Sequence, residues 1–321
     1  MNRPNARPRR LREVIHAAIR ALREARVSFG HGTTNARDEA AYLALHALAL
    51  PLDTSDWDIE ISAADARKVQ SLLARRIRSR KPAAYLTHEA WLGDFRFYVD
   101  ERVIVPRSYI ADLLADDLAP WLARPARVRN ALDLCTGSGC LAILLAHSFP
   151  RAEVDAADLS PDALAVARRN VDDYRLGERI ALVQSDLYAG LGGRRYDVIV
   201  SNPPYVTQAA MRALPAEYRR EPRLALEGGT DGLDLVRRIV HEAPDHLSDG
   251  GWLVVEAGHA RRRVERAFPR LPMIWAATSG GDDCVFLISR EALIEGLALS
   301  TRATTRAASP RRPAAPRAVR A

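Results

Sequence analysis

The chain has 321 residues, of which 48% are hydrophobic and 27% are charged, and its formal net charge is +7. This length predicts two domains, and the composition excludes a disordered or fibrous protein. The longest apolar run, residues 42–52, contains eleven residues, whereas a membrane-spanning helix needs about 18, so we expect no membrane span. Three cysteines exclude a disulfide scaffold and favour a reducing compartment, for which we expect the cytoplasm.

The positive charge is concentrated at the two ends of the chain. Residues 1–12 contain five Arg and residues 300–321 contain six, and neither segment contains an acid. Removing these eleven charges from +7 leaves −4 for residues 13–299, so the charge gives little support to nucleic-acid binding by the folded body. We expect basic disordered extensions at 1–12 and 291–321. A mitochondrial transit peptide is the alternative for the first segment, but the helical pattern that follows it directly favours an extension.

The first part of the chain is predicted to be helical. Apolar spacing and proline positions predict three helices, over residues 11–22, 38–50 and 63–80. Ser62 and Asp65 resemble a capping box at the start of the third helix. These elements predict a small helical N-terminal domain over 13–87.

The pattern changes after residue 87. Residues 91–92 and 95–99 read as two short strands around a Gly93-Asp94 turn, with 103–105 extending them, which predicts a β-hairpin linker over 88–107. Strands and helices then alternate, with strands at 131–134, 154–158, 180–183, 197–201, 252–256 and 284–288 and helices at 141–146 and 161–177. Such alternation predicts an α/β domain over 108–290, with a mainly parallel sheet and helices on both faces.

A glycine-containing loop joins the first of these strands to its helix. It reads Asp133-Leu-Cys-Thr-Gly-Ser-Gly-Cys140. Ligands of open α/β sheets bind beyond the carboxyl ends of the strands, and glycines let the backbone approach them closely. The segment from Gly137 to Ala142 also fits the dinucleotide pattern G-x-G-x-x-G/A. The loop therefore predicts a nucleoside-containing ligand, with a plain tight turn as the alternative.

Acids follow the next two strands. Asp158 lies about 20 residues beyond the glycines, where an acid accepts hydrogen bonds from ribose hydroxyls. Asp155 competes for this role, but Asp158 ends the apolar run and precedes the Ser160 helix start. Asp186 follows the third strand and is a candidate contact to an adenine or its amino group. NAD remains possible at this point.

The sequence Asn202-Pro203-Pro204-Tyr205 follows the strand at 197–201 and decides between these ligands. It matches the (D/N/S)-P-P-(Y/F) signature of amino-methyltransferases. Proline has no N–H, so the site offers acceptors, the Asn202 side-chain oxygen and the Pro203 carbonyl, which can hold a planar NH₂ group. Tyr205 supplies a wall for a flat substrate or an electron-rich face for a sulfonium. Asn202, Pro203 and Tyr205 are the candidate catalytic residues, Pro204 joins them in the substrate site, and we expect catalysis by positioning.

These motifs together resemble the protein-glutamine N-methyltransferases, a family that acts on release factors and ribosomal proteins. The similarity covers about residues 35–290 and includes the glycine loop, the Asn-Pro-Pro-Tyr sequence and the segment from Glu221 to Leu233. It implies a class I (Rossmann-like) methyltransferase fold with a mainly parallel seven-stranded sheet. It also implies S-adenosyl-L-methionine as cofactor and a glutamine side-chain amide as acceptor.

The resemblance assigns roles to individual residues. Asn202 and Pro203 hold the acceptor amide, and Asp158 binds the ribose. The rest of the expected cofactor set comprises Asp133, Cys135, Thr136, Gly137, Ser138, Gly139, Asp186 and Asn202. The general methyltransferase loop has Gly where Cys135 stands, so we expect altered loop packing there. No Cys/His cluster is visible in the sequence, and we expect no metal.

The segment from Val99 to Ser108 resembles the branch that acts on the third protein of the large ribosomal subunit. The release-factor branch typically reads Pro-Arg-Pro-Glu-Thr where this chain reads Pro106-Arg-Ser-Tyr109. The expected partner is therefore a large-subunit ribosomal protein, recognised by the helical domain, with weak ribosomal RNA contact through the basic tails. A release-factor substrate, RNA guanine N-methylation and a noncatalytic assembly role remain alternatives. DNA adenine methylation is disfavoured because only about 115 residues follow Tyr205.

Overall fold

The computed structural model describes residues 9–308, which begin with a helical domain. Its helices are α1 (Leu11–Glu24), α2 (Ala36–Ala47), α3 (Ala63–Ser79) and α4 (Ala83–Thr87). The expected cap is present, because the Ser62 hydroxyl accepts the Asp65 N–H at 3.0 Å. Helix α2 starts two residues earlier than predicted, since Asn35 caps it, and ends earlier, since Ala49 has a φ of +52°.

The basic segment 1–12 was expected to be disordered, and this is wrong for residues 9–12. Strand β1 (Arg9–Arg10) pairs with β2 (Glu60–Ile61), and Leu11 is fully buried at the start of α1. The pairing partner lies about 50 residues away in the sequence, so the local composition gave no sign of it. Residues 1–8 lie outside the described part of the chain.

The predicted hairpin is confirmed as β3 (Ala90–Leu92) and β4 (Phe95–Phe97), but residues 103–105 do not extend it. Val103 and Val105 are buried in a separate cluster with Tyr85 and Val166. The Val105 N–H donates to the Glu221 carboxylate at 3.0 Å rather than to a neighbouring strand. The segment is therefore held by side chains from both domains.

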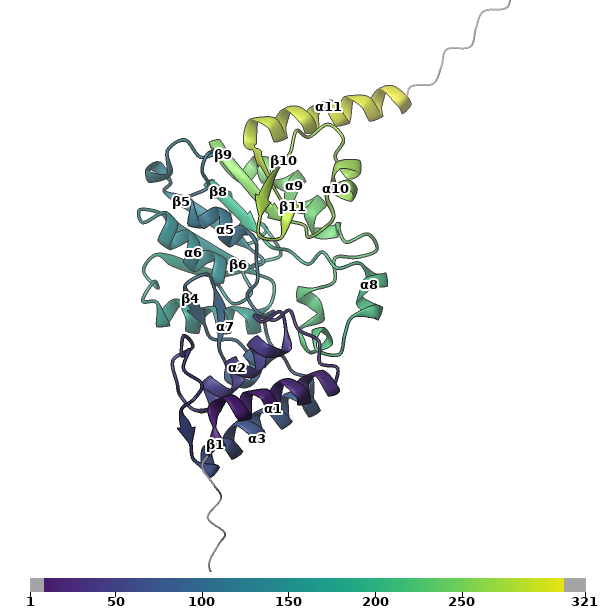
Figure 1. Cartoon of the computed structure of the whole chain (residues 1–321). Coiled ribbons are helices and arrows are strands. Elements are labelled where there is room, and N and C mark those ends of the chain that lie inside the picture. Colours follow the sequence, from purple (N-terminus) through teal and green to yellow (C-terminus); the bar gives the residue numbers. More distant parts are fainter. Residues whose placement is uncertain (1–8, 309–321) are drawn as a thin grey trace, which may run out of the picture.

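A seven-stranded sheet forms the second domain, as the resemblance implied (Figure 1). Its order is β10-β11-β9-β8-β5-β6-β7, and β11 alone runs opposite to the other six strands. The strands are β5 (Asn130–Leu134), β6 (Glu153–Asp158), β7 (Ile180–Gln184), β8 (Tyr196–Ser201), β9 (Leu247–Glu256), β10 (Ile274–Thr278) and β11 (Gly281–Ser289). Strand β10 was not predicted; it lies at the sheet edge, and Ile274 is 39% exposed.

Helices cover both faces of the sheet because the strand side chains alternate between them. Val198 and Val200 pack with α5 (Ile110–Ala115), α6 (Cys140–Ser148) and α7 (Pro161–Asp173). Ile199 packs on the other face with α9 (Asp234–His246), α10 (Arg261–Ala267) and α11 (Arg290–Ala308). Between β8 and α9 the chain forms α8 (Gln208–Ala213) and the 3₁₀ turns Tyr218–Arg220 and Arg223–Ala225. No helix in the described range is long and apolar enough to cross a membrane.

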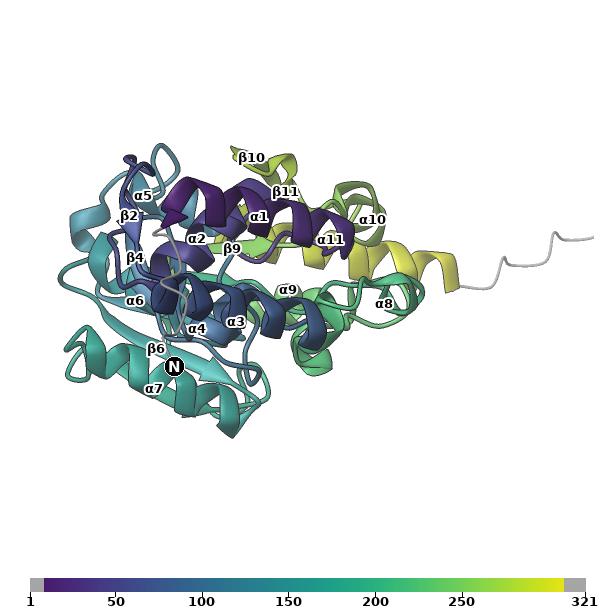
Figure 2. The same cartoon turned by 60° about the horizontal axis from the view of Figure 1, so that its bottom comes forward.

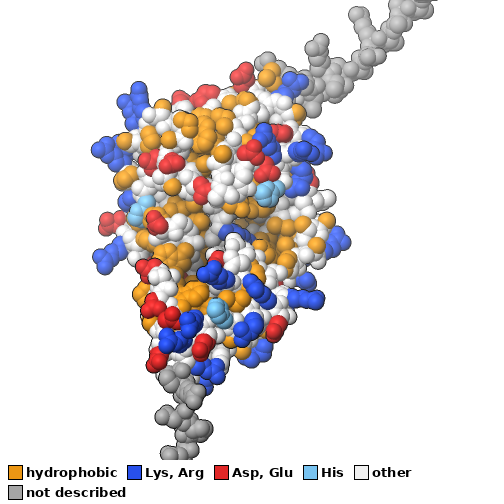
Figure 3. Space-filling view, in the orientation of Figure 1, with side chains coloured by type: hydrophobic (Ala, Val, Ile, Leu, Met, Phe, Trp, Pro, Cys, Tyr) orange, Lys and Arg blue, Asp and Glu red, His pale blue; other side chains and the backbone are white. Residues whose placement is uncertain are grey.

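The helical domain lies beside the carboxyl-terminal half of the chain rather than on a flexible arm. The helices α1, α2 and α3 lie together at the bottom of the molecule in Figure 1 and come forward in Figure 2, and Arg80 at the end of α3 donates to Glu217 of the segment after α8 at 2.9 Å. Figure 3 shows a hollow between the lower and upper parts of one face, with hydrophobic side chains along it. The two domains therefore share a surface, and its contacts matter for the site below.

The expected disordered tail from residue 291 is also corrected by the structure. Helix α11 continues to Ala308, and its Leu293 is fully buried against the sheet domain. A few apolar residues on one face of this Ala- and Arg-rich helix are sufficient to pack it against the sheet domain. Residues 309–321 lie outside the described range.

This docking predicts a measurable contribution to stability. Leu293→Ala should lower the free energy of unfolding by about 2–5 kcal/mol, because it leaves a cavity in the core. Ile294→Ala, at a neighbouring side chain that is 44% exposed, should change it by less than about 1 kcal/mol. Urea denaturation monitored by circular dichroism compares the two. Equal effects would show that α11 is not docked as described.

Candidate functional site

The strands β5, β6, β7 and β8 end at one edge of the sheet, and a cavity lies beyond these ends. The strand order turns at β5, which has β6 on one side and β8 on the other. Open α/β sheets bind ligands at such a point. We call this the strand-end cavity. Six of the predicted site residues line it: Cys135, Gly137, Asp158, Asp186, Asn202 and Pro204.

Two segments other than the strand ends also line the strand-end cavity. Residues 102–104 cover it from the segment after the hairpin, and residues 222–225 cover it from the segment after α8. Leu159 and Leu224 also line it and are 51% and 57% exposed. Their apolar side chains are available to a flat apolar ligand.

Asp158 fastens the glycine loop to the end of β6. Its two carboxylate oxygens each accept a backbone N–H at 2.9 Å, one from Gly137 and one from Ser160. Burial raises the pKa of Asp158, although these bonds oppose the shift. Asp155, the competing residue, instead pairs with Arg194 at 2.7 Å and accepts the Tyr196 hydroxyl. Asp158 and not Asp155 therefore lines the cavity.

Asp133 lies fully buried beneath the loop. Its Oδ2 accepts the Thr136 hydroxyl at 2.5 Å and the Ala142 N–H at 3.0 Å. Its Oδ1 is buried and has no partner among the described residues. Burial raises the pKa of Asp133 to about 7. The site thus contains one carboxylate oxygen whose hydrogen-bonding capacity is unused.

The other predicted loop residues divide into two groups. The side chains of Thr136 and Ser138 are buried beneath the loop and do not line the cavity. Gly139 has a φ of +79°, and a Cβ there would lie 3.1 Å from Ala167 Cβ, so its role is close packing against α7. Cys135 lines the cavity with a φ of +60°, a conformation that favours glycine. This explains why glycine is common at that place in such loops.

Asp186 lines the cavity but already has a partner. Its Oδ1 lies 2.8 Å from Arg238 on α9, and both side chains are about half exposed. The ion pair leaves Oδ2 of Asp186 free of any contact within residues 9–308. A contact to an adenine amino group would use that second oxygen.

A second cavity of about 160 Å³ is also lined by Asn202. Pro203, Tyr205, Arg107 and Tyr218 line it, and we call it the Tyr205 cavity. Asn202 lines both this cavity and the strand-end cavity. Ile104 and Ala225 also line both cavities, so the two cavities are neighbours.

Glu256 orients Tyr205. The sequence did not predict Glu256 as a site residue. The Tyr205 hydroxyl donates to Glu256 Oε1 at 3.1 Å. The other oxygen of this buried carboxylate accepts the Ser108 hydroxyl at 2.7 Å and the Tyr109 N–H at 2.8 Å. Burial raises the pKa of Glu256. Its place at the end of β9 is the same signal that identified Asp158.

Glu221 belongs to the segment that resembles the methyltransferase family, but no role was predicted for it. In the structure it forms a buried ion pair beside the Tyr205 cavity. Both of its oxygens pair with the Arg107 guanidinium, at 2.5 and 2.8 Å. His31 Nε2, from the helical domain, lies 3.4 Å from the same carboxylate. Burial alone would raise the pKa of Glu221, but His31 and Arg107 hold it at about 2.

Comparison with known proteins agrees with this geometry. Residues 111–217 match the family described as Methyltransferase small domain. The ribosomal protein uL3 glutamine methyltransferase of Bordetella pertussis is 55% identical over 88% of this chain and 96% of its own length. Those of Neisseria meningitidis serogroup A and Burkholderia pseudomallei are each 54% identical, over 88% and 87% of this chain and 94% of their own lengths. The chain belongs to the ribosomal protein uL3 glutamine methyltransferase family.

Membership confirms the class I methyltransferase fold that the sequence predicted. The strand order and the reversed β11 are the features of this fold in the structure. The chain is therefore an enzyme that transfers methyl groups. The two cavities share Asn202 of the Asn-Pro-Pro-Tyr sequence.

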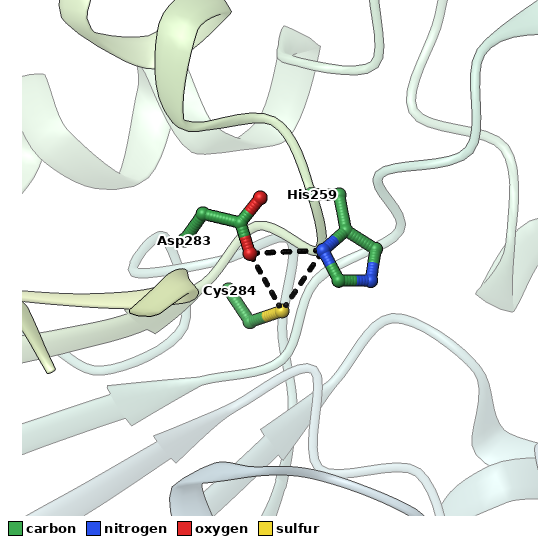
Figure 4. A group of neighbouring side chains, drawn as sticks. All are labelled: His259, Asp283 and Cys284. Atoms are coloured by element: carbon green, nitrogen blue, oxygen red, sulfur yellow. Dashed lines mark hydrogen bonds and ion pairs between the residues drawn. The ribbon is translucent and has the colours of Figure 1, made fainter. Parts of the chain in front are cut away.

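The methyltransferase also carries a cluster of His259, Asp283 and Cys284 at this edge of the sheet (Figure 4). His259 Nδ1 lies 2.9 Å from Asp283 Oδ1, and the Cys284 thiol donates to the Gly280 carbonyl at 3.3 Å. A nitrogen and an oxygen bound to tetrahedral zinc lie about 3.3 Å apart, whereas 2.9 Å is an ordinary hydrogen-bond distance. Hydrogen bonds therefore account for the cluster.

The Tyr205–Glu256 bond predicts a stability effect. Tyr205→Phe removes the hydrogen bond to a buried carboxylate oxygen, and the free energy of unfolding should fall by about 1–3 kcal/mol. Tyr218→Phe is the matched control, because its hydroxyl makes only a 3.4 Å bond to the Phe29 carbonyl. Thermal or urea unfolding measures both. A Tyr218→Phe effect as large as that of Tyr205→Phe would contradict the role given to Glu256.

Proposed function

We propose that this methyltransferase transfers a methyl group from S-adenosyl-L-methionine to the side-chain amide nitrogen of a glutamine in ribosomal protein uL3. The observation that carries the proposal is that Asn202 lines both cavities. The names of the relatives supply the substrate. A ribosomal-protein substrate also favours the cytoplasm as the place of reaction.

The residues of the strand-end cavity, together with the buried Asp133 that lies beside it without lining it, fit S-adenosyl-L-methionine. Asp133 Oδ1, buried and without a partner among the described residues, suits the cofactor's ammonium group, directly or through water. Asp158 suits the ribose hydroxyls, and the exposed Leu159 and Leu224 suit the adenine. A Cβ at Gly137 would meet nothing within 4 Å, so the loop leaves open space there. When bound, the cofactor supplies an electrophilic methyl group on a positively charged sulfur.

The residues of the Tyr205 cavity suit a neutral amide. Asn202 makes no hydrogen bond through its side chain within residues 9–308, and Pro203 and Pro204 have no N–H to donate. The Asn202 Oδ1 and the Pro203 carbonyl accept the two N–H bonds of the glutamine amide and orient its face. Tyr205, held by Glu256, limits where the amide plane lies.

Positioning is the main contribution of the chain to catalysis. None of the described residues that line the Tyr205 cavity is Asp, Glu or His, so no carboxylate or imidazole base faces the amide. Holding two reacting groups in line lowers the barrier by removing their translational and rotational freedom. The nitrogen's proton is then released to solvent during or after transfer.

Asp133 makes cofactor affinity depend on pH. Its raised pKa of about 7 means that it is neutral at lower pH and becomes an anion as the pH rises. The anion attracts the cofactor's ammonium, so affinity should increase from about pH 5.5 to pH 7, by up to about tenfold per pH unit, with proton release on binding. Titration calorimetry in buffers of different ionisation enthalpy measures this release. Asp133→Asn should abolish the pH dependence; affinity of the wild type that does not change with pH would exclude the proposed contact.

A methylation assay tests the function and its alternatives. Labelled S-adenosyl-L-methionine is offered with purified uL3, with a release factor and with ribosomal RNA. We expect label in a glutamine of uL3, and Asn202→Ala should lower kcat by at least about a thousandfold while cofactor affinity stays within about threefold. Label in the release factor would reject the substrate, and label in RNA would reject the reaction.

Weak ribosomal RNA contact through the basic ends remains part of the proposal. Residues 1–8 and 309–321 lie outside the described range, so the structure has no bearing on them. Truncations that test the tails should stop at these limits, because removal of residues 9–12 would also remove Leu11 from the core.

A further inference from the structure

We infer that His31 of the helical domain is a positioning residue that sets the wall of the Tyr205 cavity and so places the acceptor glutamine. The inference rests on the proposed function. It gives the helical domain a role inside the reaction site, beyond the substrate recognition expected of it.

The segment between α8 and α9 forms the outer wall of the Tyr205 cavity. Leu214, Tyr218, Ala225 and Leu226 from this segment line the cavity. Apart from two three-residue 3₁₀ turns, this segment has no regular structure. Its position must therefore come from contacts with other parts of the chain.

The helical domain supplies these contacts through two arginines of its α3 region. Glu217 is 1% exposed, and its Oε1 lies 2.9 Å from Arg80 and 3.6 Å from Arg76. Arg76 is itself fully buried and paired with Glu39 at 2.9 Å. Buried ion pairs are costly when one partner is lost, so this clamp fixes the start of the segment.

His31 and the preceding residue, Gly30, pack directly against Tyr218. The two ring centroids lie 4.2 Å apart, and His31 is 3% exposed. A Cβ at Gly30 would lie only 2.1 Å from the Tyr218 hydroxyl oxygen, so the backbone approaches this side chain as closely as glycine permits. Any shift of His31 therefore moves Tyr218.

The second neighbour of His31 connects it to the other side of the cavity. His31 Nε2 lies 3.4 Å from Glu221, whose carboxylate holds the Arg107 guanidinium and the Val105 N–H. Arg107 lies 5.7 Å from the centre of the Tyr218 ring, and both side chains line the cavity. His31 thus contacts Tyr218 directly and Arg107 through Glu221, without lining the cavity itself.

The test distinguishes a role of His31 in positioning the acceptor glutamine from a role in docking uL3 and from a role in folding. His31→Phe keeps an aromatic ring against Tyr218 and removes the nitrogen facing Glu221, whereas His31→Gln keeps a polar donor there. His16→Phe, on the exposed face of α1, is the matched control. Each variant is assayed with intact uL3 and with a short peptide that contains the target glutamine.

We expect His31→Phe to lower kcat by about tenfold to a hundredfold on both substrates, with KM for uL3 and cofactor affinity within about threefold of wild type. His31→Gln should recover most of the loss, and His16→Phe should match wild type. A change confined to KM for intact uL3 would show docking and overturn the inference, as would unchanged kcat. Loss of thermal stability without rescue by His31→Gln would show a merely structural role and also overturn it.

Failure of the inference is distinguishable from failure of the proposed function. Wild-type protein that methylates no glutamine substrate would refute the function, and the inference with it. Active wild type with a fully active His31→Phe variant would refute the inference alone.

Discussion

The site depends on one constraint, that the parallel strands β5, β6 and β8 end at the same edge of the sheet. Their backbone hydrogen bonds fix the register, so Asp133, Asp158 and Asn202 reach that edge together. The Asp158 bond to the Gly137 N–H then fixes the loop between β5 and α6. The sheet and the glycine loop therefore set the positions of the residues around the strand-end cavity.

The Tyr205 cavity is built differently from the strand-end cavity. No strand of the sheet supplies the outer wall of the Tyr205 cavity among the described residues; the segment between α8 and α9 does. That segment is held by buried carboxylates, with Glu217 bound to the helical domain and Glu221 bound to Arg107. A buried carboxylate is stable only with its cations in place. The segment between α8 and α9, the segment around Arg107 and the helical domain therefore stabilise one another through these ion pairs.

Local patterns predicted most of the elements but not the regular structure of residues 9–12 and 291–308. The Ser62 cap, the Gly93-Asp94 turn and the alternating strands were visible because each depends on residues close in the sequence. The ordered residues 9–12 and helix α11 were missed because their burial depends on partners far away, Ile61 for Arg9 and the sheet domain for Leu293. Composition alone cannot reveal such partners.

The sequence by itself determined which residues are candidates for the site, because the glycine loop, the acid after β6 and the Asn-Pro-Pro-Tyr sequence are each recognisable within a few residues. Tertiary structure alone decided that Asn202 lines two cavities, that Glu256 orients Tyr205, and that His31 and Arg107 meet at Glu221. The physical reason is the range of the interactions. Turns, caps and strand-end motifs act over neighbouring residues, whereas His31 and Glu221 are 190 positions apart in the sequence and meet only when the two domains pack.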